Sequence, residues 1–189
     1  MEVRQRLPRA FWIYAAFTAA TMSGFATFGV LSFHLVTHRL LTAAAVPVLY
    51  AGAMAVDAAA ALATGWAYDR VGPKVLAVLP VLAAGVPVLA FTRGLPLAVA
   101  GALVWGAAMG VQESTLRATV ADLVGPRRRA TAYGIFAAVV GAATAAGGAV
   151  AGVLYDVSIS LLITVTACIQ AAALILLAVT RPVRSAPAR

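Results

Sequence analysis

The sequence predicts an all-α membrane protein that crosses the bilayer six times and keeps both termini in the cytoplasm. Of its 189 residues, 63% are hydrophobic and only 11% are charged, whereas a soluble domain carries about 25% charged residues. Because so few charges cannot cover the surface of a globule, lipid must be the solvent. The lengths of the apolar runs and the placement of the basic residues then set the topology.

Long uncharged runs define the helices, since a spanning helix needs about 20 mostly apolar residues. The runs 40–56 and 58–68 are each short and are separated only by Asp57, so we join them into one helix with a buried acid. The first run, 10–33, exceeds the apolar region of about 7–15 residues in a signal peptide and is expected to be a true helix. The expected helices cover about 10–36, 43–68, 75–92, 95–121, 130–155 and 157–180.

The basic residues fall mainly on one side of this topology. Only Arg39 and Arg93 fall on the other side, and because Lys and Arg mark the cytoplasmic side of a membrane protein, both termini are predicted to be cytoplasmic. The net charge of +8 follows from this bias. No basic helix face of the kind that binds nucleic acid is present. The predicted cytoplasmic basic residues are Arg4, Arg6, Arg9, Arg70, Lys74, Arg117, Arg127, Arg128, Arg129, Arg181, Arg184 and Arg189.

A short motif that occurs twice in the sequence favours an inverted repeat of three helices followed by three helices. Residues 65–69 read GWAYD at the end of the second expected helix, and residues 152–156 read GVLYD at the end of the fifth. One of these ends is predicted to be cytoplasmic and the other external. Two halves of opposite topology are the arrangement found within many transporters.

Residues 65–74, which read GWAYDRVGPK between the second and third expected helices, carry the most specific motif. They resemble the signature loop of the major facilitator superfamily of secondary transporters, G-x-x-x-D-(R/K)-x-G-(R/K)-(R/K). Pro73 departs from that pattern and removes one positive charge. The matching residues are Gly65, Asp69, Arg70, Gly72 and Lys74.

The resemblance implies the fold and the activity. A complete member of this family has two six-helix halves, and this chain is similar to one half, more like the C-terminal one. It implies secondary transport of a small solute by alternating access in the plasma (inner) membrane of a bacterium. The chain would pair with itself, pair with a separately encoded half, or belong to a longer chain. A remnant or regulatory membrane subunit with the same half-fold is the alternative.

The resemblance also implies that the signature loop is a latch. Asp69 would sit against the N-terminus of a neighbouring helix, where the helix dipole favours a carboxylate. Arg70 and Lys74 resemble the basic residues that pair with nearby carboxylates, and Asp122 could meet either of them. Gly65 permits close helix approach, and Gly72 permits a tight turn with positive φ.

Asp57, near the middle of the second expected helix, is the candidate residue for substrate binding or proton coupling. An unpaired charge at mid-membrane costs at least ~2.5–3.5 kcal/mol, so Asp57 must face protein or water. Ala53, Ala61 and Gly65 share its helix face and form a stripe of small residues. The other interpretation is a hydrogen-bonded acid at a helix contact.

Glu113 and Arg117 are spaced i, i+4 with the acid first, the better order for a helical ion pair. They form either a neutralised pair with Arg117 reaching the interface or a gate that opens during transport. His34 and His38, near the external end of the first helix, are either a proton relay or interfacial polar residues. Trp105 lies deeper and could line a cavity.

Other residues are expected to pack helices or to anchor them. Gly106 and Gly110 form a small-x-x-x-small pair, and a second glycine-rich face is predicted on the fifth helix. Aromatic residues near helix ends are expected to be interfacial anchors. The fifth-helix face comprises Gly134, Gly141, Ala145, Gly148 and Gly152, and the anchors are Trp12, Tyr14, Trp66, Tyr68 and Tyr155.

No catalytic or cofactor-binding constellation is found in the sequence. A nucleotide-binding loop, a zinc signature and a nucleophile elbow are all missing, and the single cysteine, Cys168, has no partner for a disulfide or a metal site. We therefore expect no enzyme activity, no metal and no cofactor. The expected partners are membrane lipid, a small-molecule substrate and a second six-helix half.

Overall fold

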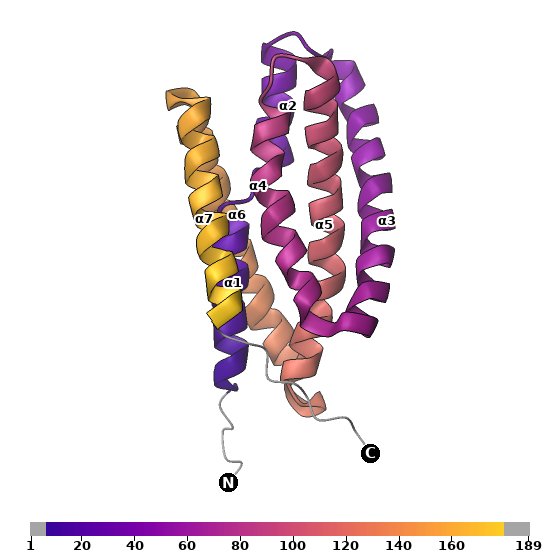
Figure 1. Cartoon of the computed structure of the whole chain (residues 1–189), viewed down its shortest axis with the longest axis vertical. Helices are drawn as coiled ribbons and strands as arrows, with labels where there is room; N and C mark the ends of the chain where they lie inside the picture. Colours follow the sequence, from indigo (N-terminus) through magenta and orange to yellow (C-terminus); the bar gives the residue numbers. More distant parts are fainter. Residues whose placement is uncertain (1–6, 180–189) are drawn as a thin grey trace.

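The computed structural model describes residues 7–179, and every regular element in this part of the chain is a helix (Figure 1). This confirms the predicted all-α class. The α-helices are α1 (Arg9–Ser23), α2 (Phe28–Thr37), α3 (Val46–Val71), α4 (Val78–Ala90), α5 (Leu95–Leu123), α6 (Arg129–Val157) and α7 (Ile159–Val179). Short 3-10 helices lie between some of them, namely η1 (Ala43–Ala45), η2 (Gly72–Ala77) and η3 (Pro126–Arg128).

Five stretches of the described residues are long and apolar enough to cross a membrane, where the sequence predicts six crossings. The stretches are Arg9–Thr37, Ala43–Ala90, Leu95–Leu123, Pro126–Val157 and Ile159–Val179. The difference lies in Ala43–Ala90, because this stretch holds both α3 and α4 on either side of η2. Figure 1 shows that the chain turns at η2 and that α4 runs back up the bundle. A straight helix of 48 residues would be about 72 Å long, against a hydrocarbon core of about 30 Å.

The first expected helix, 10–36, is interrupted between α1 and α2. Gly24 lies so close to α7 that a Cβ atom there would be 2.8 Å from Ile169 Cγ2. Thr27 then caps α2, with its hydroxyl oxygen accepting a hydrogen bond from the Val30 N–H at 3.5 Å. The indole N–H of Trp105 donates to the Ala26 carbonyl oxygen at 2.9 Å. The cap residue Thr27 and the Trp105 side chain of α5 thus satisfy backbone groups that the break leaves free, as irregular backbone inside a membrane protein requires.

The closest helix contact joins α3 to α5. A Cβ atom at Gly106 would overlap the backbone of Ala53, and one at Gly110 would overlap the backbone of Asp57. This confirms close packing at the predicted small-x-x-x-small pair. Gly106 faces Ala53, and Gly110, one turn later, faces Asp57, one turn later on α3. The two helices α3 and α5 therefore run parallel.

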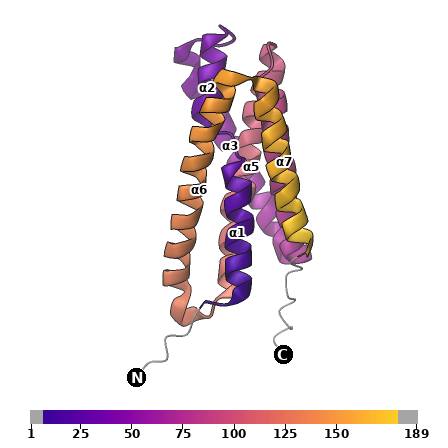
Figure 2. The same cartoon turned by 90° about the vertical axis from the view of Figure 1, so that its left-hand side faces the viewer.

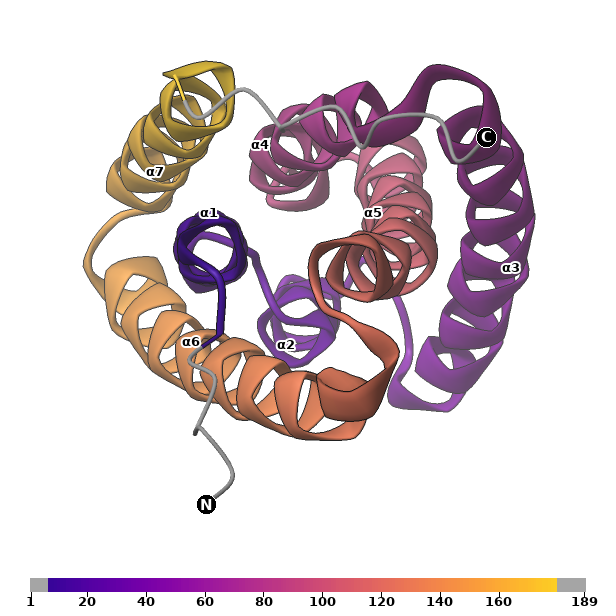
Figure 3. The same ribbon diagram turned by 90° about the horizontal axis from the view of Figure 1, so that it is seen from below.

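The remaining helices enclose a core around α1, α2, α4 and α5. Figure 2 shows α1 between α6 and α7, and it shows that α1 begins and α7 ends at the same end of the bundle. Seen from below, α2 and α5 lie between α3 on one side and α6 on the other, while α4 and α7 lie on the far side (Figure 3). The face that presents α2 and α5 is therefore flanked by α3 and α6. Side chains such as Phe17, Leu35, Leu79 and Val86 are almost completely buried in the core.

Candidate functional site

The signature loop forms the turn between α3 and α4. Gly72 ends α3 with φ 69°, and its N–H donates to the Tyr68 carbonyl oxygen. This left-handed φ favours glycine because a Cβ atom would be strained there, so the predicted role of Gly72 in a tight turn is confirmed. Pro73 begins η2 directly after it. Pro73, which departs from the family pattern, therefore lies at the start of a helix, where its fixed φ is favourable.

The charged side chains of the loop point away from the core. Asp69, Arg70 and Lys74 are exposed, and the Arg70 guanidinium lies 3.5 Å from the centre of the Trp66 ring. A cation over an aromatic face is attracted by the ring, so Trp66 orients Arg70. A Cβ atom at Gly65 would meet no atom within 4 Å. The close helix approach expected at Gly65 does not occur within the described chain.

Tyr68 ties the loop to α5, a role that the sequence does not reveal. Its side chain is buried, and its hydroxyl lies 3.0 Å from Thr119 Oγ1 and donates to Asp122 Oδ2 at 3.0 Å. Asp122, expected to meet Arg70 or Lys74, forms an ion pair with neither of them in the described structure. Thr119 and Asp122 are spaced i, i+3 on α5 and therefore share one face. That spacing is the only sequence signal for this anchor.

Asp57 lies half-buried on the side of α3 that packs against Gly110. Its Oδ1 atom is buried and makes no hydrogen bond to any described residue. Further along the same seam, Thr64 Oγ1 and Ser114 Oγ are 2.9 Å apart. The small-residue stripe thus supports a helix contact, while the carboxylate oxygen itself has no partner in that contact.

Glu113 and Arg117 do not form an ion pair in the structure of residues 7–179, and both side chains are exposed. Glu113 lies near enough to Asp57 for the two carboxylates to interact electrostatically. The Arg117 carbonyl oxygen accepts a hydrogen bond from the Tyr133 hydroxyl at 3.1 Å. This segment of α5 therefore contacts α6 through the backbone carbonyl of Arg117, and the charged groups of Glu113 and Arg117 do not contact each other.

An aromatic cluster surrounds Trp105 next to the break between α1 and α2. The Trp105 ring centre lies 5.1 Å from that of Phe28 and 6.3 Å from those of Phe25 and Tyr50. Phe28 and Tyr50 meet edge to face at 4.9 Å. Trp105 is only 7% exposed, whereas Tyr50 is 43% exposed. The cluster is therefore held in the core by Trp105, and its exposed part is the ring of Tyr50.

His34 is a buried link between three parts of the bundle. Its ring nitrogens lie 2.8 Å from the Tyr155 hydroxyl and 3.1 Å from the Thr92 carbonyl oxygen, and its side chain is 1% exposed. Because a carbonyl oxygen only accepts, Nε2 must be the donor to Thr92. His38 stacks on His34 with ring centres 4.2 Å apart. His34 therefore joins α2 to the segment after α4 and to α6, and its side chain is buried within the protein.

The tyrosines expected as interfacial anchors are partly drawn into the protein. Tyr14 is 6% exposed, and its hydroxyl donates to the Leu116 carbonyl oxygen at 3.3 Å. Tyr155 is half-buried against His34 and Phe91. Trp12 and Trp66 remain exposed, at 49% and 58%.

The glycine-rich face of α6 is largely open. Cβ atoms at Gly134, Gly141 and Gly152 would meet nothing within 4 Å, whereas one at Gly147 would overlap the backbone of Ser23. Only 6% of the apolar window of Pro126–Val157 is buried, compared with 44% for Leu95–Leu123. Helix α6 therefore contacts α1 through Gly147, and a Cβ atom at Gly148 would lie 3.0 Å from Thr27 Cγ2, whereas the positions of Gly134, Gly141 and Gly152 are open in the described chain.

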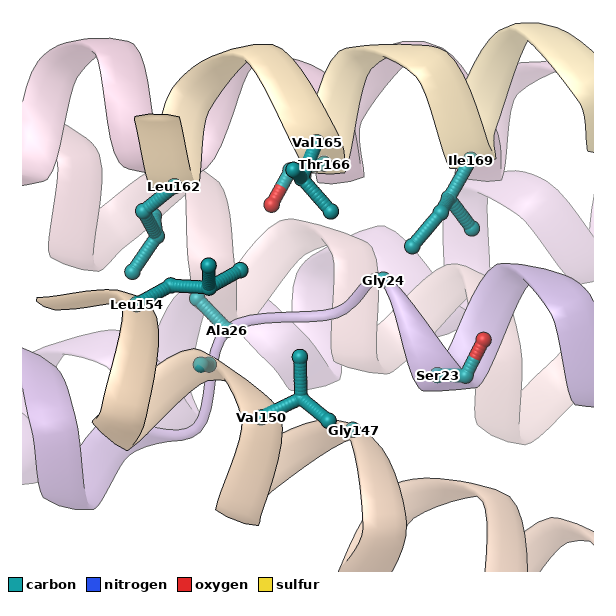
Figure 4. Close-up of a pocket in the computed structure, with 11 residues that line it drawn as sticks. Ser23, Gly24, Ala26, Gly147, Val150, Leu154, Leu162, Val165, Thr166 and Ile169 are labelled. Atoms are coloured by element: carbon teal, nitrogen blue, oxygen red, sulfur yellow. The ribbon is translucent and has the colours of Figure 1, made fainter. Parts of the chain in front are cut away.

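A pocket lies beside the break between α1 and α2, against α6 and α7 (Figure 4). Figure 4 shows apolar side chains from both helices, such as Val150 and Ile169, around it. Ser23 and Thr166 contribute its hydroxyl groups, and no ionisable side chain lines it. The pocket can therefore offer neither acid–base chemistry nor a counter-charge to an ion.

No metal site is evident in the described part of the chain, because no three His, Cys, Asp or Glu side chains come together there. Cys168 is exposed and free. The chemistry available at membrane depth is therefore that of carboxylates, hydroxyls, amides and aromatic rings.

Comparison with known proteins gives the family. Uncharacterized proteins of Mycobacterium bovis and of two strains of Mycobacterium tuberculosis are each 58% identical to the chain over 181 residues, which is 96% of the chain. The chain spans 44% of the length of each of these relatives. The sequence model of the Major Facilitator Superfamily matches residues 10–189. With its apolar helices and its signature turn, the chain is an integral membrane protein that belongs to the major facilitator superfamily of transporters.

Proposed function

We propose that the chain forms one half, the C-terminal one, of a secondary transporter that moves a small solute across the plasma (inner) membrane of a bacterium by alternating access. The observation that carries this proposal is the signature motif at a structural turn. Gly72, Asp69 and Arg70 match the family pattern, and Gly72 adopts the positive φ that the motif needs. The mycobacterial relatives support a bacterial membrane.

We propose six crossings, with both termini in the cytoplasm. The turn at η2 divides Ala43–Ala90 into α3, of 26 residues, and α4, of 13 residues, and α4 together with η2 is long enough to reach about the bilayer's depth. Helix α1 begins at the end of the bundle where α7 ends. Arg70, Lys74 and Arg127 lie at or next to η2 and η3, which are at that same end, whereas Arg39 and Arg93 lie at connections of the opposite end. This distribution agrees with the positive-inside rule.

The inverted repeat of three plus three helices is part of the proposal. Asp69 ends its GWAYD segment near the C-terminus of α3, and Asp156 ends GVLYD near the C-terminus of α6. The two helices end at opposite ends of the bundle (Figure 1 and Figure 2). Repeats of opposite topology place a substrate site near the midplane, at the interface of the repeats.

A second six-helix half would complete the pathway. The relatives are more than twice as long as the matched segment, since the chain spans 44% of each. The open glycines of α6, Gly134, Gly141 and Gly152, provide a surface on which another helix can approach closely. Such a half would cover the face of α2 and α5 between α3 and α6 (Figure 3).

Within this transporter, we propose that Gly65, Asp69, Arg70, Gly72 and Lys74 form the latch. Asp69 is free of ion pairs in the described structure and is exposed, so it is available to a helix of the second half. We propose Glu113 and Arg117 as the gate. Because they form no ion pair in the described structure, this structure would correspond to the state in which the gate pair is broken. Asp57 remains the candidate for substrate binding or proton coupling.

A flux assay tests the proposal. The assembled protein is reconstituted into liposomes that contain a panel of radiolabelled solutes, and exchange and gradient-driven uptake are measured. We expect saturable flux of at least one solute, and we expect this flux to be reduced when Gly72 is replaced by Val. If no solute in a broad panel moves above empty liposomes, the chain belongs instead to a remnant or regulatory membrane subunit.

A further inference from the structure

We propose that the face of α2, α3 and α5 binds an organic cation with an aromatic or apolar body, so that the solute is an amine or an onium compound. The ring cluster of Phe28, Tyr50 and Trp105 would receive the apolar body, and Asp57 would receive the positive charge. This inference deepens the proposed transport function and rests on it for the role of the site, though not for the binding itself.

The aromatic part of the site is fixed in place but accessible. The indole N–H of Trp105 is held by the Ala26 carbonyl oxygen at 2.9 Å, and the Trp105 ring contacts those of Phe28 and Tyr50. Tyr50 is 43% exposed, so part of its ring is available to a ligand. Aromatic faces attract cations within about 6 Å of the ring centre.

The polar part of the site contains two buried acceptor atoms without a partner. Asp57 Oδ1 and Gln112 Oε1 are buried oxygen atoms that make no hydrogen bond within the described chain. Glu113 adds a second negative charge near Asp57. Neither carboxylate forms an ion pair with a described Arg, Lys or His residue. Unpaired acceptors at membrane depth are costly, and a cation is the ligand that compensates them.

The helix register brings the two parts to one side of the α3–α5 seam. Tyr50 and Asp57 are about two turns apart on α3, and Trp105 and Gln112 have the same separation on α5. Because the two helices run parallel, the pair formed by Asp57 and Gln112 lies below the ring contact of Tyr50 and Trp105. The distance along the axis is about 10 Å, which a bulky cation with aromatic rings around its charged centre can span.

The site lies on the face that a second half would cover. Helices α2 and α5 are flanked by α3 and α6 in Figure 3, and the break between α1 and α2 lies beside the ring cluster through Ala26 and Phe28. The opposite charge is disfavoured here because an anion would meet Asp57 and Glu113. A neutral solute could donate a hydrogen bond to Asp57, but it would supply no counter-charge to the carboxylate.

A pair of probes with the same shape and opposite charge tests the site. Binding of radiolabelled tetraphenylphosphonium and tetraphenylborate to the purified, assembled protein is measured in detergent at equilibrium. The two ions are measured in separate samples, because they associate with each other when mixed. We expect saturable binding of the phosphonium and no saturable binding of the borate. Equal binding of the two ions, or no saturable binding of the phosphonium, overturns the proposal.

Variants assign the binding to the named side chains. Asp57→Asn should weaken phosphonium binding about tenfold or more, and Asp57→Glu should restore most of it. Tyr50→Leu, which keeps an apolar side chain, should weaken it about two- to fivefold. Asp156→Asn, an exposed acid at the end of α6, is the matched control and should leave binding unchanged. Equal effects of Asp57→Asn and Asp156→Asn overturn the assignment, and size-exclusion elution of each variant verifies that it remains assembled.

The test separates failure of this inference from failure of the proposed function. Binding with the expected charge preference but without flux in liposomes supports the site and contradicts transport. Flux of a neutral or anionic solute without selective phosphonium binding supports transport and overturns the cation site.

Discussion

At the scale of single residues, the hydroxyl of Tyr68 is the clearest structural link of the signature segment. We expect Tyr68→Phe to lower the free energy of unfolding by about 1–2 kcal/mol, because the change removes a half-buried hydrogen bond to Asp122 and the buried contact with Thr119. Equilibrium unfolding of the protein in mixed detergent micelles measures this. Tyr133→Phe is the matched control, since its hydroxyl bonds the Arg117 carbonyl oxygen in a more exposed place. A loss no larger than that of the control would contradict the anchoring role.

The partners of individual side chains are also the features that the sequence predicts least well. Asp57 could be recognised because a lone acid stands out in an apolar helix, and Gly72 because it belongs to a motif. The sequence predicts Tyr68 and Tyr14 as interfacial anchors and leaves His34 as a proton relay or an interfacial residue, yet all three side chains are buried and bonded to distant helices. An aromatic residue near a helix end carries no mark of its partner helix. These bonds depend on which helices are neighbours, and a single sequence does not contain that information directly.

At the scale of elements, the seam between α3 and α5 makes the sharpest prediction. We expect Gly110→Ala to destabilise the protein by about 1–3 kcal/mol, because the added Cβ would overlap the backbone of Asp57 and force the helices apart. Gly85→Ala is the matched control on α4, where a Cβ would meet no atom within 4 Å. That control should be neutral or stabilising by up to about 1 kcal/mol, since alanine favours helix over glycine. Thermal unfolding in detergent compares the two, and equal effects would contradict the packing.

The turn between α3 and α4 is the second element that can be tested. Asp69→Asn keeps the side-chain shape and removes the charge that a helix N-terminus favours by ~0.3–1 kcal/mol. We expect transport by the complete protein to fall while its amount in the membrane stays near that of the wild type. Gly72→Val should add about 1–3 kcal/mol of backbone strain at φ 69° and should also reduce transport. Unchanged flux in both variants would mean that the motif has no role in the cycle.

Element boundaries show what hydropathy can and cannot reveal. Apolar runs predict α5, α6 and α7 closely, because length and polarity alone decide where such a helix lies. They miss the break after Ser23, because Gly24 and Thr27 interrupt the helix without adding charge. At the break, Gly24 lies against Ile169 of α7, far along the chain, and hydropathy does not reveal such a contact. Joining 40–56 to 58–68 across Asp57 agrees with the single helix α3.

At the scale of the whole molecule, the topology is the prediction on which the proposed pathway depends. Cysteines are introduced singly at Arg93 and Arg127, both exposed, after Cys168 has been replaced by alanine. With six crossings, a membrane-impermeant maleimide should label Arg127→Cys only from the cytoplasmic side and Arg93→Cys only from outside, because α5 crosses the bilayer between them. A third cysteine at Arg184, which lies outside the described residues, should label like Arg127→Cys.

Five crossings, with α3 and α4 forming one span, would still separate the first two positions but would place residue 74 of η2 inside the bilayer. Lys74→Cys therefore decides the count: labelling from the cytoplasmic side supports six crossings, and protection from the reagent on both sides contradicts them.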